Sequence, residues 1–516
     1  MKTVVLKIDK FNEGMSDDVR DQLNGVFTLT RNFDIFSNRK RMTPYRDTNQ
    51  ANTITSTSSL MTELIAKNFL YAAGDSTFYA LSNRSSGQPG FFRLLKNTSP
   101  IDSNFALAST ASQTSIGVAH KSVFVEYKDY LWGLKGSGAA TAGKLDVWRW
   151  GALSTGAKAL TENYGGADVV TGSAPTANGI IGDDDNLYLP TKNTLVRVNA
   201  ALAVTDAVLT IPSNFTITSL DKWGRYLAIG CKPDNSNAES KTFFWDYVSD
   251  DVFDSIAMGR GNLQVIGNID GSIIGILDVG TNSSFAINRK IQILEWNGGS
   301  VRVIKEIPYN SIALSVYTYK QKIGNKLYFI ISDTVTYGVW VIGRKLSTDP
   351  LAVTFDRYLS NDTPVTDAVN AFYFIGDFLF ASVGTAGNFR RTNEQASGAF
   401  TSTSMYKSQK FNAGDLSKVK QLKSVALTTV PIPSGGTVKL DYRIDATSTS
   451  DLISTWTQIF SKTTQGAYYH EAATVESAAR EFSDGHEFEF RVRSTGFVEP
   501  IDLKPVFEVI DDQIEE

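Results

Sequence analysis

The stretch that decides the fold is AFYFIGDFLFASV, from Ala371 to Val383. Two apolar runs rich in aromatic residues flank Gly376 and Asp377, and residues of this kind favour β-strands. A two-residue connection that contains glycine predicts a tight hairpin, because the turn requires positive φ and glycine adopts it without a steric penalty. We therefore predict two paired strands on either side of Gly376 and Asp377.

The same pattern recurs along most of the chain. Two apolar runs surround a short polar or glycine-containing turn in residues 64–81, 123–134, 180–189, 217–229, 263–277 and 316–331. Several of these repeats are followed by one more apolar run, at Leu145–Trp150, Leu195–Val198, Phe243–Trp245, Ile291–Trp296 and Val339–Ile342. Small sheets of this size are the building blocks of radial β-architectures.

The spacing of the repeats indicates a β-propeller. An early apolar residue after each central turn serves as a marker: Leu70, Leu131, Leu187, Leu227, Ile274, Leu327 and Leu379. Neighbouring markers lie about 40 to 60 residues apart, as in known propeller repeats. A single blade cannot bury both of its faces, so blades stack radially. We predict an all-β chain whose residues 56–400 form a β-propeller of about seven blades; a large β-sandwich or a β-solenoid is the alternative.

Length and composition set further limits. A chain of 516 residues is too long for one compact core, and 42% hydrophobic with 20% charged residues is an ordinary globular composition. A net charge of −4 argues against general nucleic-acid binding, which requires concentrated Lys and Arg. The dense basic cluster is Arg39-Lys40-Arg41, with Arg46 close behind.

The cysteine content and the N-terminal residues indicate the cellular compartment in which the protein is made. The one cysteine, Cys231, has no second cysteine with which to form an internal disulfide. It ends an apolar run, so we expect its side chain to be buried as a small hydrophobic group. No apolar run approaches the length of a membrane helix. The N-terminal MKTVVLKIDKF lacks the apolar region and cleavage site of a signal peptide. We expect a protein that is made in a cytoplasm and then assembles with other components.

Residues 1–55 and 401–516 differ from the repeats. The first segment alternates apolar and polar residues and predicts an arm that pairs with the body of the protein or with a neighbouring subunit, with a short helix from Ser16 to Leu23. The last segment contains TVKLDYRID, where apolar side chains alternate with charged ones. This alternation predicts half-buried antiparallel strands in a C-terminal β-sandwich or jelly roll. Its apolar face would hold Val438, Leu440, Tyr442 and Ile444, and its polar face Lys439, Asp441 and Arg443.

Motifs near both ends resemble tail structural proteins of tailed bacteriophages, in particular the nozzle and tail-hub propeller proteins of short-tailed phages. In the arm, the resemblance rests on Phe11, Gly14, Met15, Arg20, Asn32, Phe33, Asp34, Ile35, Arg41, Pro44 and Tyr45. In the C-terminal segment, it rests on residues 406–414, 418–423 and 442–445 and on Trp456. In such proteins an arm precedes a propeller and a distal β-domain.

The resemblance implies a virion structural protein with no enzymatic activity. Several copies, by analogy six, would form a ring that forms or lines the DNA-ejection channel and contacts adjacent tail or portal-adaptor proteins. DNA would pass without specific binding, and no membrane insertion is expected. The protein would be made in the host cytoplasm and reside in the tail. Docking is expected to involve Phe33, Asp34, Arg39, Lys40, Arg41, Pro44 and Tyr45.

Chemical motifs give little support to catalysis. His120, His470 and His486 stand outside any spaced metal motif. The consecutive carboxylates Asp183 to Asp185 offer oxygen ligands for calcium, but a solvated turn explains them better. We expect neither a catalytic residue nor a cofactor nor a bound metal.

Two other functions stay open. Trp residues on one propeller face would make a receptor- or glycan-binding tail protein, although blade packing explains most of them. A propeller glycoside hydrolase would need carboxylates that converge in a central pocket. The residues in question for glycan binding are Trp132, Trp148, Trp150, Trp223, Trp245, Trp296 and Trp340.

Overall fold

The computed structural model is all-β, since the residues that it describes include strands and no helix. The expected helix from Ser16 to Leu23 lies outside the described residues. Those residues are 2–9, 27–36, 40–46, 48–50, 64–84, 92–97, 106–107, 125–136, 144–155, 158–167, 169–171, 177–235, 238–279, 290–308, 315–332, 338–344, 346–355, 369–376, 378–383, 389–392, 403–412, 417–446 and 455–510.

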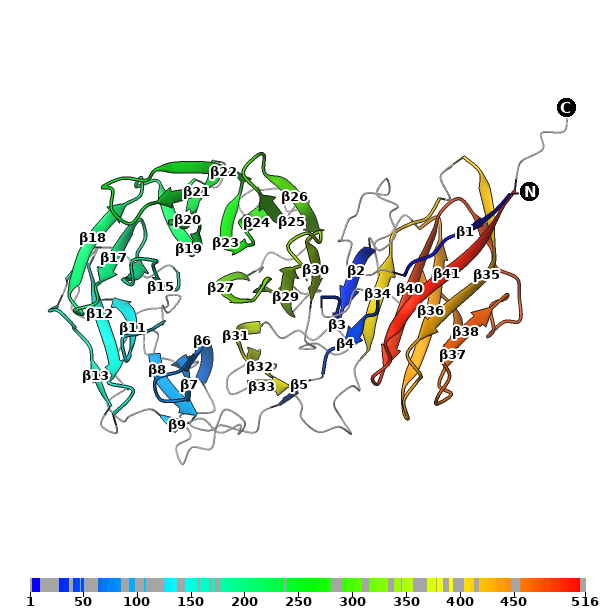
Figure 1. Cartoon of the computed structure of the whole chain (residues 1–516), viewed down its shortest axis with the longest axis horizontal. Coiled ribbons are helices and arrows are strands. Elements are labelled where there is room, and N and C mark those ends of the chain that lie inside the picture. Colours follow the sequence, from blue (N-terminus) through cyan, green and yellow to red (C-terminus); the bar gives the residue numbers. More distant parts are fainter. Residues whose placement is uncertain are drawn as a thin grey trace.

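The middle of the chain forms a β-propeller, as predicted. Its described strands make seven antiparallel sheets that lie around a common axis (Figure 1). Blade 1 contains β6 (Leu64–Ala72), β7 (Thr77–Arg84), β8 (Phe92–Asn97) and β9 (Ala106–Leu107). Blade 2 contains β10 (Val125–Tyr127), β11 (Tyr130–Gly136), β12 (Lys144–Gly151), β13 (Ala159–Thr161) and β14 (Val170–Thr171). Blade 3 contains β15 (Ile180–Ile181), β16 (Leu187–Pro190), β17 (Thr194–Val198) and β18 (Val204–Thr210).

Blades 4 to 7 continue the ring in chain order. Blade 4 contains β19 (Phe215–Trp223), β20 (Tyr226–Pro233), β21 (Glu239–Trp245) and β22 (Asp254–Arg260), and blade 5 contains β23 (Asn262–Ile269), β24 (Ser272–Val279), β25 (Lys290–Trp296) and β26 (Arg302–Pro308). Blade 6 contains β27 (Ser315–Ile323), β28 (Lys326–Ser332), β29 (Gly338–Gly343) and β30 (Ala352–Phe355). Blade 7 contains β31 (Val369–Ile375), β32 (Phe378–Val383) and β33 (Phe389–Thr392), together with β5 (Thr48–Gln50).

The hairpin around Gly376 has the expected two-residue turn. Ile375 lies opposite Phe378 across the turn, and Gly376 has φ of 55°. The additional apolar runs predicted after the hairpins are also strands, namely β12, β17, β21, β25 and β29. One marker was misplaced, because Leu70 belongs to β6, the strand before its turn. The apolar run there spans both strands, so the sequence pattern alone did not locate the turn.

The C-terminal part is the predicted β-sandwich. One sheet has the order β1-β41-β35-β38 with β39 also on β35, and the other contains β2, β34, β40, β36 and β37. Phe507 packs between the sheets with its ring centroid 4.9 Å from that of Phe488. The strands are β1 (Lys2–Val5), β2 (Phe27–Arg31), β34 (Ser404–Ser408), β35 (Val419–Thr429), β36 (Thr437–Ile444), β37 (Thr457–Lys462), β38 (Tyr469–Ala472), β39 (Asp484–Gly485), β40 (Phe488–Thr495) and β41 (Pro500–Ile510).

The charged face of β36 corrects a prediction. Val438, Leu440 and Tyr442 are buried as expected, but Asp441 and Arg443 on the opposite face are buried too, at 1% and 6% exposed. Buried charges require partners, and both Asp441 and Arg443 have them. The Arg491 and Arg493 guanidinium groups donate to Asp441, and Nε of Arg443 lies 2.5 Å from Oε2 of Glu489.

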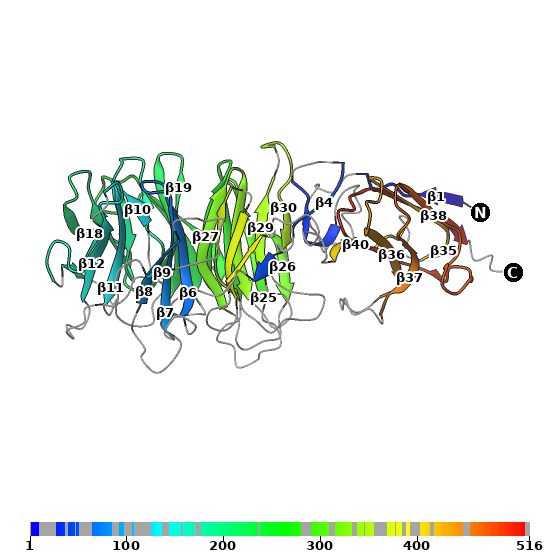
Figure 2. The same ribbon diagram turned by 90° about the horizontal axis from the view of Figure 1, so that it is seen from below.

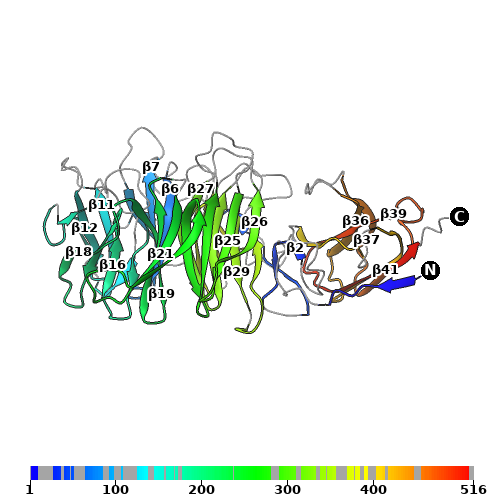
Figure 3. The ribbon, with the colours of Figure 1, turned by 90° about the horizontal axis from the view of Figure 1, so that it is seen from above.

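The side views show how the two parts are joined. The blades stand side by side in a disc, and the sandwich lies beyond one edge of that disc (Figure 2). Strands β1 and β41 lie at the end of the molecule remote from the propeller (Figure 3). The chain is therefore elongated, with the arm strands β2, β3 (Phe33–Asp34) and β4 (Thr43–Pro44) at the junction between propeller and sandwich (Figure 1).

Candidate docking site

The first strand of the arm belongs to the sandwich. β1 pairs antiparallel with β41, so that Val4 lies opposite Phe507. Hydrogen bonding continues beyond the strand, because the backbone N–H groups of Ile8 and Leu503 each donate to the other residue's carbonyl at 2.9 Å. The Ile8 side chain is 2% exposed and adds apolar burial to this pairing.

The second strand of the arm connects sandwich and propeller. β2 pairs antiparallel with β34 and parallel with β30, where Arg31 lies opposite Phe355. The hydroxyl of Thr354 in β30 donates to the carbonyl of Thr30 at 3.1 Å and strengthens this link. Blade 6 and one sandwich sheet thereby form a continuous nine-stranded sheet across the junction.

Three predicted docking residues are buried inside the chain. In the short hairpin of β3 (Phe33–Asp34) and β4 (Thr43–Pro44), Phe33 lies opposite Pro44. Phe33 is 0% exposed and Tyr45 is 8% exposed, and Pro44 is buried as well. Asp34 is half-buried, and its carboxylate accepts the backbone N–H of Phe36 at 2.8 Å. These side chains hold the hairpin in place within the molecule.

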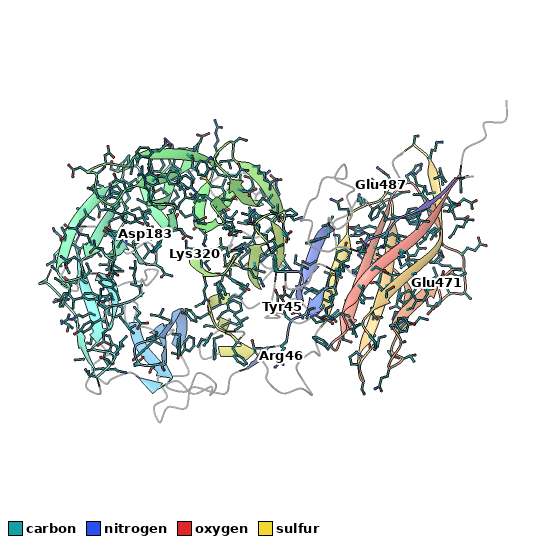
Figure 4. All side chains as sticks on the ribbon, viewed as in Figure 1. Tyr45, Arg46, Asp183, Lys320, Glu471 and Glu487 are labelled. Atoms are coloured by element: carbon teal, nitrogen blue, oxygen red, sulfur yellow. The ribbon has the colours of Figure 1, made fainter. Side chains whose placement is uncertain are left out.

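The basic residues of the segment divide into two groups. Arg41 is half-buried and forms an ion pair with the carboxylate of Glu499 at 3.1 Å. Lys40 and Arg46 are exposed, and Figure 4 shows Arg46 at the junction. Arg39 lies outside the described residues. Docking of another molecule on this segment stays a prediction, and the described cations that face solvent there are Lys40 and Arg46.

Sequence reasoning missed Glu499, which anchors the arm. Its side chain is buried, and it also accepts a hydrogen bond from the Thr43 hydroxyl at 2.6 Å. A glutamate before a proline in FVEP gives no sequence signal for this role, since its partners lie more than 450 residues away in the chain. Only the fold brings them together.

Strand β5 closes the propeller. It pairs antiparallel with β33, where Asn49 lies opposite Arg391, and completes blade 7 as its outermost strand. A strand from before blade 1 therefore finishes the last blade. Closure of this kind pairs the edge of β33 and joins both ends of the ring. The arm thus contacts the sandwich at β41 and β34 and the propeller at β30 and β33.

Polar contacts link neighbouring blades at the turns after their innermost strands; we call this set the turn belt. Its members come from different strands but share one geometry, with a side chain of one blade reaching the turn or inner strand of the next. They are Glu126 to the backbone of Ala73 and Gly74, Lys128 to Asp185, Lys222 to Asp183, Trp223 to the carbonyl of Gly271, Arg344 to Asp270, and Gln321 to the backbone of Phe374.

One buried cation lies among the inner strands. The Lys320 ammonium group donates to Asp221 Oδ2 at 2.8 Å and to the carbonyls of Leu220 and Ile266 at 2.6 Å (Figure 4). Burial lowers the pKa of Lys320, and the Asp221 carboxylate opposes that change. This pair joins blade 6 to blade 4 and was not expected from the sequence.

The run from Asp183 to Asp185 forms a turn whose carboxylates have separate partners. Asp183 pairs with Lys222 at 2.9 Å and Asp185 with Lys128 at 2.6 Å. Asp184 accepts a hydrogen bond from the Tyr188 hydroxyl at 2.6 Å. The described residues contain no group of three acidic, histidine or cysteine side chains placed to hold a metal ion.

The remaining predicted positions are structural where they are described. Trp132, Trp148, Trp150, Trp245 and Trp340 are at most 2% exposed, so blade packing accounts for them. Trp296 is 9% exposed, and Trp223 is half-buried. Burial raises the pKa of the Cys231 thiol and lowers that of His470. His486 lies near Asp445 with 3.6 Å between Nδ1 and Oδ2, and His120 lies outside the described residues.

The sheets themselves define the class of protein, a seven-bladed β-propeller with an appended β-sandwich. Similar solved structures include the WD40 domain of Neurospora crassa Pan2 (9% identity, 67% of this chain, 95% of that chain, TM-score 0.40) and the RRP9 WD40 repeats (11%, 68%, 98%, 0.41). An exo-beta-1,3-galactanase from Phanerochaete chrysosporium is similar over 88% of this chain and 99% of that chain, with 10% identity and a TM-score of 0.33.

No protein-family model matches the sequence, and no curated protein matches it either. At such low sequence identities, similarity to these solved structures concerns the fold and says nothing about function. Across the described part of the chain, no helix has the length and apolar character needed to cross a membrane.

Proposed function

We propose that this chain is a structural component of a bacteriophage tail, a nozzle-like ring protein that forms or lines the DNA-ejection channel. The resemblance of the arm and the C-terminal segment to phage tail proteins supplies the class. The observation that carries the proposal is the position of β2, which is hydrogen-bonded to β30 of the propeller and to β34 of the sandwich. One strand is thus hydrogen-bonded to both parts and connects them.

Stiffness is what a channel wall requires. The turn belt links blade to blade by charged and polar contacts, and β5 closes the ring. A scaffold of this kind resists deformation, because opening a junction between two blades separates packed side chains and breaks these polar contacts. The proposed role is therefore structural: the chain holds a fixed shape and catalyses no reaction.

The charge distribution also favours passage of DNA. Fixed, unpaired cations would hold phosphates, whereas the net charge of this chain is −4. Lys128, Lys222 and Arg344 in the turn belt each have a carboxylate partner within 3.0 Å. Such pairs present little net positive charge to a polyanion, so DNA would slide rather than bind.

Imaging of the parent particle tests the proposal. We expect cryo-electron microscopy of purified virions to contain tail density with the propeller-and-sandwich shape, repeated around the tail axis. An antibody against the chain should label the same place, and particles that lack the chain serve as the control. Virions without such density, together with a protein that stays strictly monomeric, would overturn the proposal.

Two assays on the purified protein address the other functions. A blank glycan array would weigh against receptor recognition through sugars. Turnover on a panel of glycosides would contradict the proposal that the chain is not an enzyme. Within the described inner strands, Asp221 is paired with Lys320 and is not one of two facing acids, the arrangement that glycoside cleavage requires.

A further inference from the structure

One sheet of the sandwich ends in two strands that each have an open edge. Its order is β1-β41-β35-β38, and Figure 1 shows β1 and β38 on opposite sides of β41 and β35. Among the described strands, β1 pairs with β41 alone and β38 with β35 alone. An open strand edge presents backbone N–H and C=O groups that can pair with another strand.

On the β1 edge, alternate residues direct their backbone groups away from the sheet. The N–H groups of Leu6 and Ile8 donate to carbonyls of the β41 strand and the residues before it at 3.1 and 2.9 Å. Because successive residues of an antiparallel strand alternate, the N–H and C=O groups of Thr3, Val5 and Lys7 point the other way. All three residues are exposed, and Val5 is 62% exposed.

The β38 edge has the same property. The carbonyl of Tyr468 accepts the N–H of Thr429 at 2.8 Å, so it faces the β35 side. By the same alternation, the backbone groups of Tyr469 and Glu471 point away from β35. Both residues are exposed, and Tyr469 and Tyr468 are 50% and 61% exposed. Exposed apolar side chains therefore lie at both ends of this sheet.

The outward-directed residues of both edges lie on one face of the sheet. Val5 lies opposite Val506, one residue before the buried Phe507, so its side chain points to the solvent face. Tyr469 lies opposite Thr428, which in turn lies opposite Asp502. Asp502 and Val506 are four residues apart on β41 and share that face. A strand that pairs both edges thus keeps apolar and solvent faces in register.

Neither edge is blocked. Natural proteins close open edges with proline, with a bulge or with lysine. Residues 2–8 and 469–472 contain no proline, and both strands pair with their neighbours without a register shift. Lys7 is already engaged, because its Nζ lies 2.5 Å from Oδ2 of Asp9 in the same segment.

The direction of the strands identifies the partner. Each pairing in β1-β41-β35-β38 is antiparallel, so the first and the last of these four strands run in opposite directions. A second copy in the same orientation therefore brings its β1 antiparallel to β38. A propeller blade lacks this property, because its first strand lies at the axis and only its outermost strand can offer an edge.

We propose that β38 of one copy pairs antiparallel with β1 of the next copy, with Tyr469 opposite Val5 and Glu471 opposite Thr3. The inference rests on the proposed ring and supplies its contact. Backbone hydrogen bonds would hold the two strands, and the two exposed apolar side chains would cover each other. Two different edges of identical subunits make a heterologous contact, which closes into a ring when the rotation permits.

Disulfide cross-linking of the full-length chain tests the pairing. A variant with Val5→Cys and Tyr469→Cys should form a ladder of cross-linked oligomers on a non-reducing gel, because opposite residues of paired strands lie within disulfide reach. Within one copy the two positions are three strand spacings apart, roughly 14 Å, which is too far for a disulfide. Cys231 is 0% exposed and does not compete.

Three control chains accompany this experiment. The single variants Val5→Cys and Tyr469→Cys should give no cross-linked dimer. A variant with Val248→Cys and Tyr469→Cys should give none either, since Val248 is 85% exposed but lies in the propeller. Circular dichroism and thermal melting verify that each chain is folded.

A proline at Val5 provides an independent measurement. Its N–H points away from β41, so Val5→Pro removes a donor to the second copy and spares the pairing within the chain. We expect sedimentation velocity to show association about tenfold weaker, since one backbone hydrogen bond contributes up to about that factor. Val5→Ile keeps the donor and the apolar side chain and should associate as the wild type does.

The outcomes separate this contact from the ring itself. A wild-type oligomer that gives no ladder and is insensitive to Val5→Pro would overturn the strand pairing and leave the ring standing. A wild-type chain that is monomeric at every concentration would overturn both. A dimer formed by Val5→Cys alone would show that β1 pairs with β1 about a two-fold axis, which also overturns the inference.

Discussion

The Lys320 ammonium group lies 2.8 Å from the carboxylate of Asp221, although these residues belong to blades 6 and 4, which are not neighbours. Both side chains are largely buried, at 17% and 12% exposed. Lys320 also donates to the Ile266 carbonyl in blade 5, so one side chain connects three blades. The innermost strands are thus joined by a contact that spans an intervening blade.

Removal of this lysine should destabilise the propeller. We expect Lys320→Met to lower the free energy of unfolding by about 3 kcal/mol, because it leaves Asp221 buried without its cation. Denaturant unfolding followed by tryptophan fluorescence measures the change. Lys322→Met, at an exposed position of the same strand, should have little effect. The double variant Lys320→Met with Asp221→Leu should recover much of the free energy of unfolding lost in Lys320→Met. A double variant as unstable as Lys320→Met alone would contradict this explanation.

Truncation of the arm should open blade 7. A chain that starts at Ala51 lacks β1 to β5 and exposes the edge of β33, which β5 otherwise pairs. The control is a chain that starts at Arg46, which lacks β1 to β4 but keeps β5. Relative to this control, we expect the thermal midpoint of the first variant to fall by roughly 10 °C and soluble aggregates to form through the unpaired edge. Differential scanning calorimetry and size-exclusion chromatography measure both. An unchanged midpoint in the first variant would rule out closure by β5.

Alkaline unfolding should depend on Tyr247. Burial raises the pKa of Tyr247 to about 12, and its side chain is 7% exposed. The unfolded chain loses this proton near pH 10 while the folded chain keeps it, so stability falls as pH rises from about 10 towards 12. We expect Tyr247→Phe to remove about 2 kcal/mol of that loss. Urea unfolding at neutral and alkaline pH provides the measurement, and identical pH slopes for both proteins would contradict the prediction.

Calcium should leave the protein unchanged. Asp183 and Asp185 are engaged by Lys222 and Lys128, whereas calcium requires six or more oxygen ligands in one place. We expect no binding heat in calorimetry and no shift of the thermal midpoint with added calcium or with a chelator. A saturable signal that Asp183→Asn removes would show that the ion displaces Lys222.

Local sequence patterns determined the hairpins, and tertiary structure determined what each hairpin contacts. The period-two alternation and the glycine turns predicted the strands after Gly376, the additional strands of five blades and the sandwich fold, because strand formation depends on neighbouring residues and on small turns. Burial of most Trp residues followed from the same strand patterns. The turn after Leu70 escaped prediction because a continuous apolar run spans both strands.

The position of the arm could not be derived from residue patterns. β2 offers the same alternating residues to any open sheet edge, and only the assembled molecule places it between β30 and β34. In the same way, Asp441 and Arg443 occupy a polar face by alternation, yet Arg491, Arg493 and Glu489 come from a strand about fifty residues later and make burial possible. Backbone periodicity is a local property, whereas pairing of distant edges and charges depends on the whole fold.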